Sequence, residues 1–169
     1  WAEWIPQETI IFDGARIRRT VRLNVVGRGQ IMAGELLVFG RKAHGETLVT
    51  GLIHDRWSVR IDDRLIWADG LHMEGDLAAQ INAPTGLDGT NATATAIYVA
   101  QDANQWISSV RKLIVSKSLR SGITSLGNVL LVRWVGDCAE VRDNFTNFWS
   151  EFRSMVAGLP ARLPTVWGI

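Results

Sequence analysis

Over roughly the first hundred residues, apolar positions alternate with polar ones or come in short runs broken by glycine. A period of two places apolar side chains on one face of a β-strand, whereas a helix needs them three or four positions apart. The pattern therefore predicts strands at residues 10–12, 17–25, 36–39, 48–53, 57–61, 65–73 and 92–99. Asp62 and Asp63 predict a tight hairpin turn between two of these strands, because short polar side chains tolerate a turn backbone.

The period changes after residue 101. Apolar residues then recur every three or four positions, which predicts an amphipathic helix from Asp102 to about residue 117, with Asp102 as its N-cap. A hairpin of strands 123–126 and 129–134 follows, around Gly127-Asn128, a pair suited to a type II′ turn.

The second predicted helix begins after residue 137. Asp137 and Glu140 have the spacing of a capping box, and Gly158-Leu159-Pro160 ends the helix. One face carries large apolar side chains, namely Val141, Phe145, Phe148, Trp149, Phe152 and Val156. The sequence thus predicts one domain over residues 1–169, with a strand-rich part at 1–101 and a helix–hairpin–helix part at 102–169.

Composition narrows the possible partners and the compartment. The chain has 18 basic and 17 acidic residues, and no block of Lys and Arg long enough to favour a nucleic-acid partner. No apolar run reaches the length of a membrane span, so no membrane partner is expected. Cys138 is the only cysteine, which excludes an internal disulfide and indicates a reducing compartment, so we expect a cytoplasmic protein.

The stretch GELLVFGRKAHGE, residues 34–46, has three possible roles: a phosphate loop, a metal site or a strand turn. A phosphate loop is excluded because five residues, not four, separate Gly34 from Gly40, and Arg41 follows where the motif needs lysine. A metal-dependent hydrolase would use His44, His54 or His72 with Glu46, but the spacing matches no zinc motif. Structural roles are favoured for all three histidines. Likewise, Arg16, Arg18 and Arg22 share a strand face for which solvation is favoured over an acidic partner.

Several short motifs occur in the order found in one protein family. They are Trp4-Ile5-Pro6-Gln7-Glu8-Thr9-Ile10-Ile11-Phe12 with Gly14-Ala15-Arg16, then Gly34-Glu35, Phe39-Gly40-Arg41, Gly45-Glu46, Trp67-Ala68-Asp69, Leu130 to Arg133, and Leu163-Pro164 with Trp167. Together they cover nearly the whole chain. On these residues the sequence resembles the urease accessory protein D family, called H in some organisms.

The resemblance implies a mainly β fold of stacked, β-helix-like strands with a small helical part, in agreement with the two amphipathic helices that the periodicity predicts in the C-terminal third. It implies a maturation chaperone, not an enzyme, whose partners are the urease apoprotein, the accessory F protein and, through F, the GTPase G. It also implies that nickel passes through a water-filled passage in the protein, with no tightly bound cofactor. Family members are longer, so the chain is expected to be the C-terminal part of a longer protein.

A transit path should hold a divalent ion weakly, with oxygen ligands and retained water. The candidate passage residues are carboxylates inside the matching motifs: Glu8, Glu35, Glu46 and Asp69, with Asp13 and Glu74 as weaker candidates. His44, where many relatives carry methionine, is a speculative nickel ligand. The alternative for each carboxylate is an ion pair with an arginine such as Arg16 or Arg41. Alternative functions are a β-rich binding scaffold unrelated to urease and, less favoured, the metal-dependent hydrolase.

Overall fold

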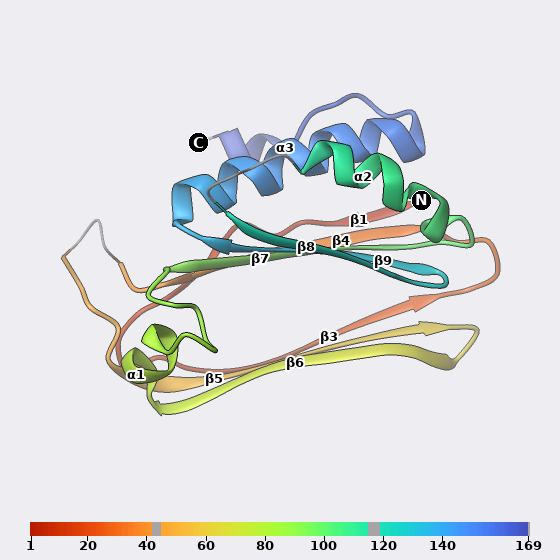
Figure 1. Cartoon of the computed structure of the whole chain (residues 1–169). Coiled ribbons are helices and arrows are strands. Elements are labelled where there is room, and N and C mark those ends of the chain that lie inside the picture. Colours follow the sequence, from red (N-terminus) through yellow and green to blue (C-terminus); the bar gives the residue numbers. More distant parts are fainter. Residues whose placement is uncertain (42–44, 115–118, 169) are drawn as a thin grey trace.

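The protein has three layers, formed by two helices, a six-stranded sheet and a three-stranded sheet (Figure 1). The structure is a computed structural model and describes residues 1–41, 45–114 and 119–168. Helices α2 (Ile107–Leu113) and α3 (Cys138–Ala157) cover one face of the larger sheet, and the smaller sheet lies against its other face. The predicted mainly β fold with two amphipathic helices in the C-terminal third is confirmed.

The six-stranded sheet has the strand order β1-β4-β7-β9-β8, and β2 also pairs with β4. Strands β1 and β2 run parallel to β4, whereas the β4–β7, β7–β9 and β8–β9 pairs are antiparallel. Its strands are β1 (Ala2–Trp4), β2 (Thr9–Ile11), β4 (Ile31–Phe39), β7 (Ala92–Val99), β8 (Arg120–Leu126) and β9 (Val129–Gly136). Gly127, in the turn between β8 and β9, has a φ of 62°, as the first position of a II′ turn requires.

The three-stranded sheet has the order β3-β5-β6 and is formed by β3 (Arg16–Val25), β5 (Thr50–Ile61) and β6 (Arg64–Asp76). Asp62 and Asp63 join β5 to β6 with φ values of 46° and 63°, which confirms the predicted tight hairpin. The prediction of two strands at 48–53 and 57–61 is wrong, since β5 is continuous. His54, Asp55 and Arg56 interrupt the apolar pattern but belong to the strand, because their side chains alternate between its two faces like those of their neighbours.

The first C-terminal helix is shorter than its pattern suggested. It consists of a 3-10 turn, η2 (Ala103–Trp106), followed by α2 (Ile107–Leu113). Asp102 precedes it but makes no capping bond; its carboxylate instead accepts hydrogen bonds from the Tyr98 hydroxyl at 2.9 Å and the Trp106 indole at 2.9 Å. The predicted end near residue 117 lies outside the described residues. The short helix α1 (Leu77–Asn82), capped by Asp76, was not predicted.

Helix α3 (Cys138–Ala157) matches its prediction closely. The Asp137 carboxylate accepts a hydrogen bond from the Ala139 backbone N–H at 3.0 Å, and Gly158 ends the helix with a φ of 64°. The predicted apolar face is buried against β4, β7 and β9. Close approach of α3 to β4 depends on Gly34, because a Cβ there would lie 2.9 Å from the Trp149 ring. A last 3-10 turn, η3 (Thr165–Gly168), follows.

Candidate functional site

The space between the two sheets contains two separate apolar clusters. The first cluster lies toward α1 and includes Ile11, Ala15, Leu37, Phe39, Leu48, Ile53, Met73, Leu77 and Ile81. The second cluster lies at the other end and includes Leu23, Val25, Ala33, Trp57, Val59, Ile97, Val99, Val129 and Leu131. Charged and polar side chains occupy the inward positions between these clusters. We call them the polar belt; its members are Arg19, Glu35, Asp55, Asp69, Thr95 and Arg133.

Three strands place a charged residue at the same level of the belt. On β4, Glu35 occupies the inward position between Ala33 of the second cluster and Leu37 of the first. On β5, Asp55 lies in the same way between Ile53 and Trp57, and on β3 Arg19 lies between Ile17 and Val21. Because alternate residues of a strand share one face, the sequence itself directs these three side chains into the interior.

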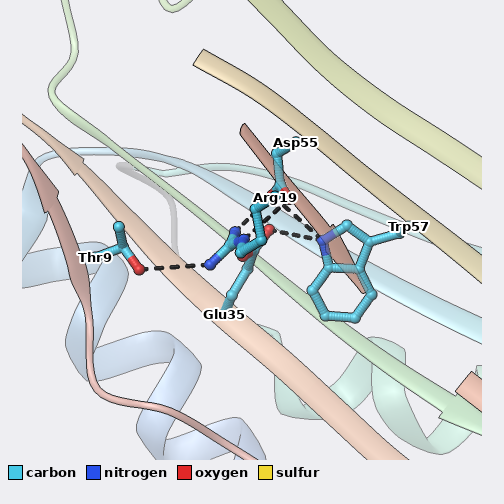
Figure 2. Close-up of polar contacts among 5 residues, drawn as sticks. All are labelled: Thr9, Arg19, Glu35, Asp55 and Trp57. Atoms are coloured by element: carbon cyan, nitrogen blue, oxygen red, sulfur yellow. Dashed lines mark hydrogen bonds and ion pairs between the residues drawn. The ribbon is translucent and has the colours of Figure 1, made fainter. Parts of the chain in front are cut away.

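Arg19 binds two carboxylates at once (Figure 2). Its Nε donates to Asp55 Oδ1 at 3.0 Å and its Nη2 to Asp55 Oδ2 at 2.5 Å, while the same Nη2 also donates to Glu35 Oε2. The Trp57 indole N–H donates to Glu35 Oε1 at 3.1 Å, and Thr9 Oγ1 accepts from Arg19 Nη1 at 3.5 Å. The Glu35 and Asp55 side chains are only 8% and 4% exposed, and that of Arg19 is 25% exposed. By formal charge, two carboxylates and one guanidinium leave one negative charge in excess.

The belt continues across the larger sheet and returns to the smaller one. Glu35 on β4 is in register with Thr95 on β7, which in turn is in register with Arg133 on β9. Arg133 forms an ion pair with Asp69 of β6, which links the two sheets on the side away from Arg19. Asp69 and Arg133 are 42% and 44% exposed, so this end of the belt is open to solvent.

A cavity of about 270 Å³ lies along the belt. Its polar lining comes from Glu35, Asp55, Asp69, Thr93, Thr95 and Arg133, and apolar residues of both sheets complete it. A space of this size with several polar groups can hold water molecules, because each water would find hydrogen-bond partners there. The site is therefore a polar, acidic cavity within an otherwise apolar sandwich.

Glu35 and Asp69 are the two predicted passage residues that the structure brings together, since both line this cavity. Glu46 lies elsewhere: it forms an ion pair with Arg41 and accepts a hydrogen bond from the Asp13 backbone N–H at 3.0 Å. These donors, the Arg41 side chain first, lower the pKa of the Glu46 carboxyl. The Asp13 pKa is also lowered, by the backbone N–H groups of Thr50 and Val49. Asp13 and Glu46 therefore connect the chain after β2 to residues 46–50 at the start of β5 through hydrogen bonds.

The remaining candidates also lie away from the cavity. Glu8 Oε1 is 3.6 Å from Arg142 Nη1, and Glu8 lines a separate groove of about 620 Å³ beside the start of α3. Glu74 is on the outer face of the smaller sheet, 3.4 Å from Arg16. His44 lies outside the described residues. The expected alternative of an arginine-paired carboxylate is thus observed for Glu8, Glu35, Glu46, Asp69 and Glu74.

Four belt residues were not identified from the sequence as site residues: Arg19, Asp55, Thr95 and Arg133. Each has a signal that could have been used, because each occupies an inward position where its neighbours two residues away are largely apolar. The inward position of Arg19 was overlooked in the sequence because Arg16, Arg18 and Arg22 lie beside it. These three residues are solvent-exposed on the opposite face of the same strand.

Within 1–41, 45–114 and 119–168, no group of three or more His, Cys, Asp or Glu residues is arranged to hold a metal ion. Over the same ranges, no helix combines the length and apolar character that crossing a membrane requires.

Fold and site together define a protein of the two-sheet β class with an internal acidic cavity and a helical cover. Comparison with known proteins gives the family: the model of the UreD urease accessory protein matches residues 1–168. The urease accessory protein UreD of Magnetococcus marinus is 36% identical over 99% of this chain and 60% of its own length. The chain belongs to the UreD urease accessory protein family.

Other relatives agree with this assignment. UreD of Xanthobacter autotrophicus is 35% identical over 98% of this chain and 55% of its own length. UreD of Granulibacter bethesdensis is 33% identical over 98% of this chain and 69% of its own length. The chain thus spans between about half and two thirds of the length of these relatives.

Proposed function

We propose that this chain acts in urease maturation, as a chaperone and not as an enzyme. In this proposal it binds the urease apoprotein and the accessory F protein, and through F the GTPase G, and helps deliver nickel to the urease active site. Membership of the UreD family supports the role, because the relatives of this chain are named as urease accessory proteins. This function is favoured over a scaffold unrelated to urease.

The acidic cavity between the sheets is the observation that carries the nickel part of the proposal. Glu35 and Asp55 share one guanidinium, so the excess formal negative charge lies where bulk solvent screens it only weakly. That charge favours entry of a divalent cation. Carboxylate and hydroxyl oxygens around retained water would hold such an ion loosely, since tight nickel sites use imidazole or thiolate ligands.

The exposed pair of Asp69 and Arg133 forms the proposed mouth of this passage. Removing the Asp69 charge should slow entry of the ion without disturbing the fold, because both side chains are nearly half exposed. We therefore expect Asp69→Asn to lower the nickel content of urease matured with this protein, while the complex with the accessory F protein still assembles. Glu35→Gln should lower the nickel content as well.

Nickel per urease active site, measured by metal analysis, is the first readout, and co-elution with the F protein in size exclusion with light scattering is the second. Asp88→Asn is a matched control, because Asp88 is also an exposed carboxylate near an arginine, 3.9 Å from Arg120 Nη1, and does not line the cavity. Normal nickel loading with Asp69→Asn and Glu35→Gln would remove the cavity from the delivery route. Failure of both this chain and a longer version of the protein to co-elute with F would contradict the proposed partners.

The hydrolase alternative receives no support from the described residues. His54 and His72 contact each other on the outer face of the smaller sheet, whereas Glu46 is bound to Arg41 and to the Asp13 backbone. Glu46 is therefore bound away from His54 and His72, with which it would have to act in a hydrolase.

A further inference from the structure

Two imidazoles meet on the outer face of the smaller sheet, outside the cavity. His54 on β5 is directly opposite His72 on β6 in the antiparallel register, and their Nδ1 atoms are 3.0 Å apart. The ring centroids are 5.2 Å apart with an interplanar angle of 75°. The cavity-facing residues Asp55 and Met73, next to them in sequence, point the other way, so this pair faces solvent.

Charged side chains from all three strands surround the pair. Glu74 Oε2 is 3.9 Å from His72 Nε2, the ring nitrogen that does not face His54. Arg18 of β3 is in register with His54, and Arg56 follows on β5. Burial lowers the pKa of His54, and the charges of Arg56, His72 and Arg18 lower it further. In its neutral form an imidazole presents one nitrogen lone pair that can serve as a metal ligand.

The two Nδ1 atoms lie within hydrogen-bond distance of each other. Two imidazole nitrogens about 2.1 Å from one metal ion lie about 3.0 to 3.4 Å apart over the common coordination angles, so a metal ion can replace this contact with little movement of the rings. The His72 side chain is 55% exposed, so its ring can turn until both lone pairs point at one ion.

We propose that His54 and His72 form a surface chelate for a divalent transition-metal ion, with Glu74 orienting the His72 ring and water completing the coordination. A carboxylate behind a ligating imidazole is the usual partner of such a ligand, because it fixes the ring's tautomer and orientation. Imidazole is a ligand that suits Ni²⁺, Cu²⁺ and Zn²⁺, whereas Mg²⁺ prefers oxygen ligands.

The chelate should bind its metal ion weakly and exchange it readily. It supplies two protein ligands where tight sites supply three or four, and the neighbouring guanidinium groups repel a cation. Arg18→Gln should therefore tighten Ni²⁺ binding, because it removes one of these charges while leaving both imidazoles in place. The site needs neither the cavity nor the proposed role in urease maturation.

The test titrates the 169-residue chain with NiCl₂ and follows the ring resonances of its three histidines by NMR, with equilibrium dialysis to measure bound nickel. We expect Ni²⁺ to broaden the signals of His54 and His72 first. His54→Gln and His72→Gln should each abolish this binding step, and Glu74→Gln should weaken it about tenfold. Asp63→Asn, which changes a carboxylate in the turn at the far end of the β5–β6 hairpin, is the control and should leave the step unchanged.

Two outcomes would overturn the chelate: nickel binding of wild-type strength in His54→Gln or His72→Gln, or ring signals of both residues that stay sharp at millimolar NiCl₂. Circular dichroism of each variant checks that the fold is kept, which we expect for outward-facing positions. Glu35→Gln should not change this binding step. Its behaviour separates the two proposals, since loss of nickel delivery with an intact chelate would implicate only the cavity.

Discussion

Replacing Arg19 with methionine tests whether the polar belt is held together by charge compensation. Methionine keeps most of the length and apolar volume of the arginine side chain but removes its guanidinium. Glu35 and Asp55 would then remain buried at 8% and 4% exposure, with the Trp57 indole N–H as their shared hydrogen-bond donor. Two like charges would face each other in a space with little water.

The expected loss of stability follows from this burial. Removing one partner of a buried ion pair costs about 3–5 kcal/mol, because the charge left behind is uncompensated. Arg19 is a quarter exposed, so water can partly replace it, and we expect a loss of about 3 kcal/mol, at the lower end of that range. For a domain of this size the melting temperature should fall by roughly 6–12 °C.

Chemical denaturation at pH 7 measures the free energy of unfolding, and Arg18→Met provides the control. Arg18 is the preceding residue on the same strand but lies on the exposed outer face, and no described residue forms an ion pair with it. Its substitution should change the unfolding free energy by less than about 0.5 kcal/mol. The difference between the changes in unfolding free energy of Arg19→Met and Arg18→Met then reports the environment of each side chain, because the substitution is the same in both.

Adding Glu35→Gln to Arg19→Met should restore part of the lost stability, because it removes one of the two uncompensated charges. A cost for Arg19→Met similar to that of Arg18→Met, or no recovery in the double variant, would refute charge compensation as the reason for the belt.

Two further predictions follow from local geometry. Gly34→Ala should destabilise the chain by about 1–3 kcal/mol in denaturant titrations, because the new Cβ would press on the Trp149 ring; Gly122→Ala, with open space around its Cβ, should be nearly neutral, and equal costs would contradict this account. Asp13→Asn keeps an oxygen acceptor but removes a carboxylate whose pKa is lowered on folding, as is that of Glu46. A lowered pKa adds stability that is lost as the pH falls, so melting curves from about pH 6 to 3 should decline less steeply for the variant, and parallel curves would exclude this contribution.

The sequence by itself determined the local elements of this protein. Alternating apolar positions predicted β7 at residues 92–99, as observed, because strand pleating fixes which side chains share a face. The cap at Asp137 and the stop at Gly158 likewise placed α3, since both depend on backbone conformation within a few residues. The order of the short motifs along the chain by itself also indicated the family.

Only the tertiary structure decided which charged residues meet. The belt joins Arg19 to Glu35, 16 residues away, and Asp69 to Arg133, 64 residues away. The periodicity of a strand shows that a side chain points inward, but not which strand of the other sheet lies above it. For the same reason Glu35 and Asp69 could not be distinguished in advance from Glu46, because all three lie in similar motifs. Local patterning fixes the face of each strand, whereas strand order and the stacking of the sheets fix the partners.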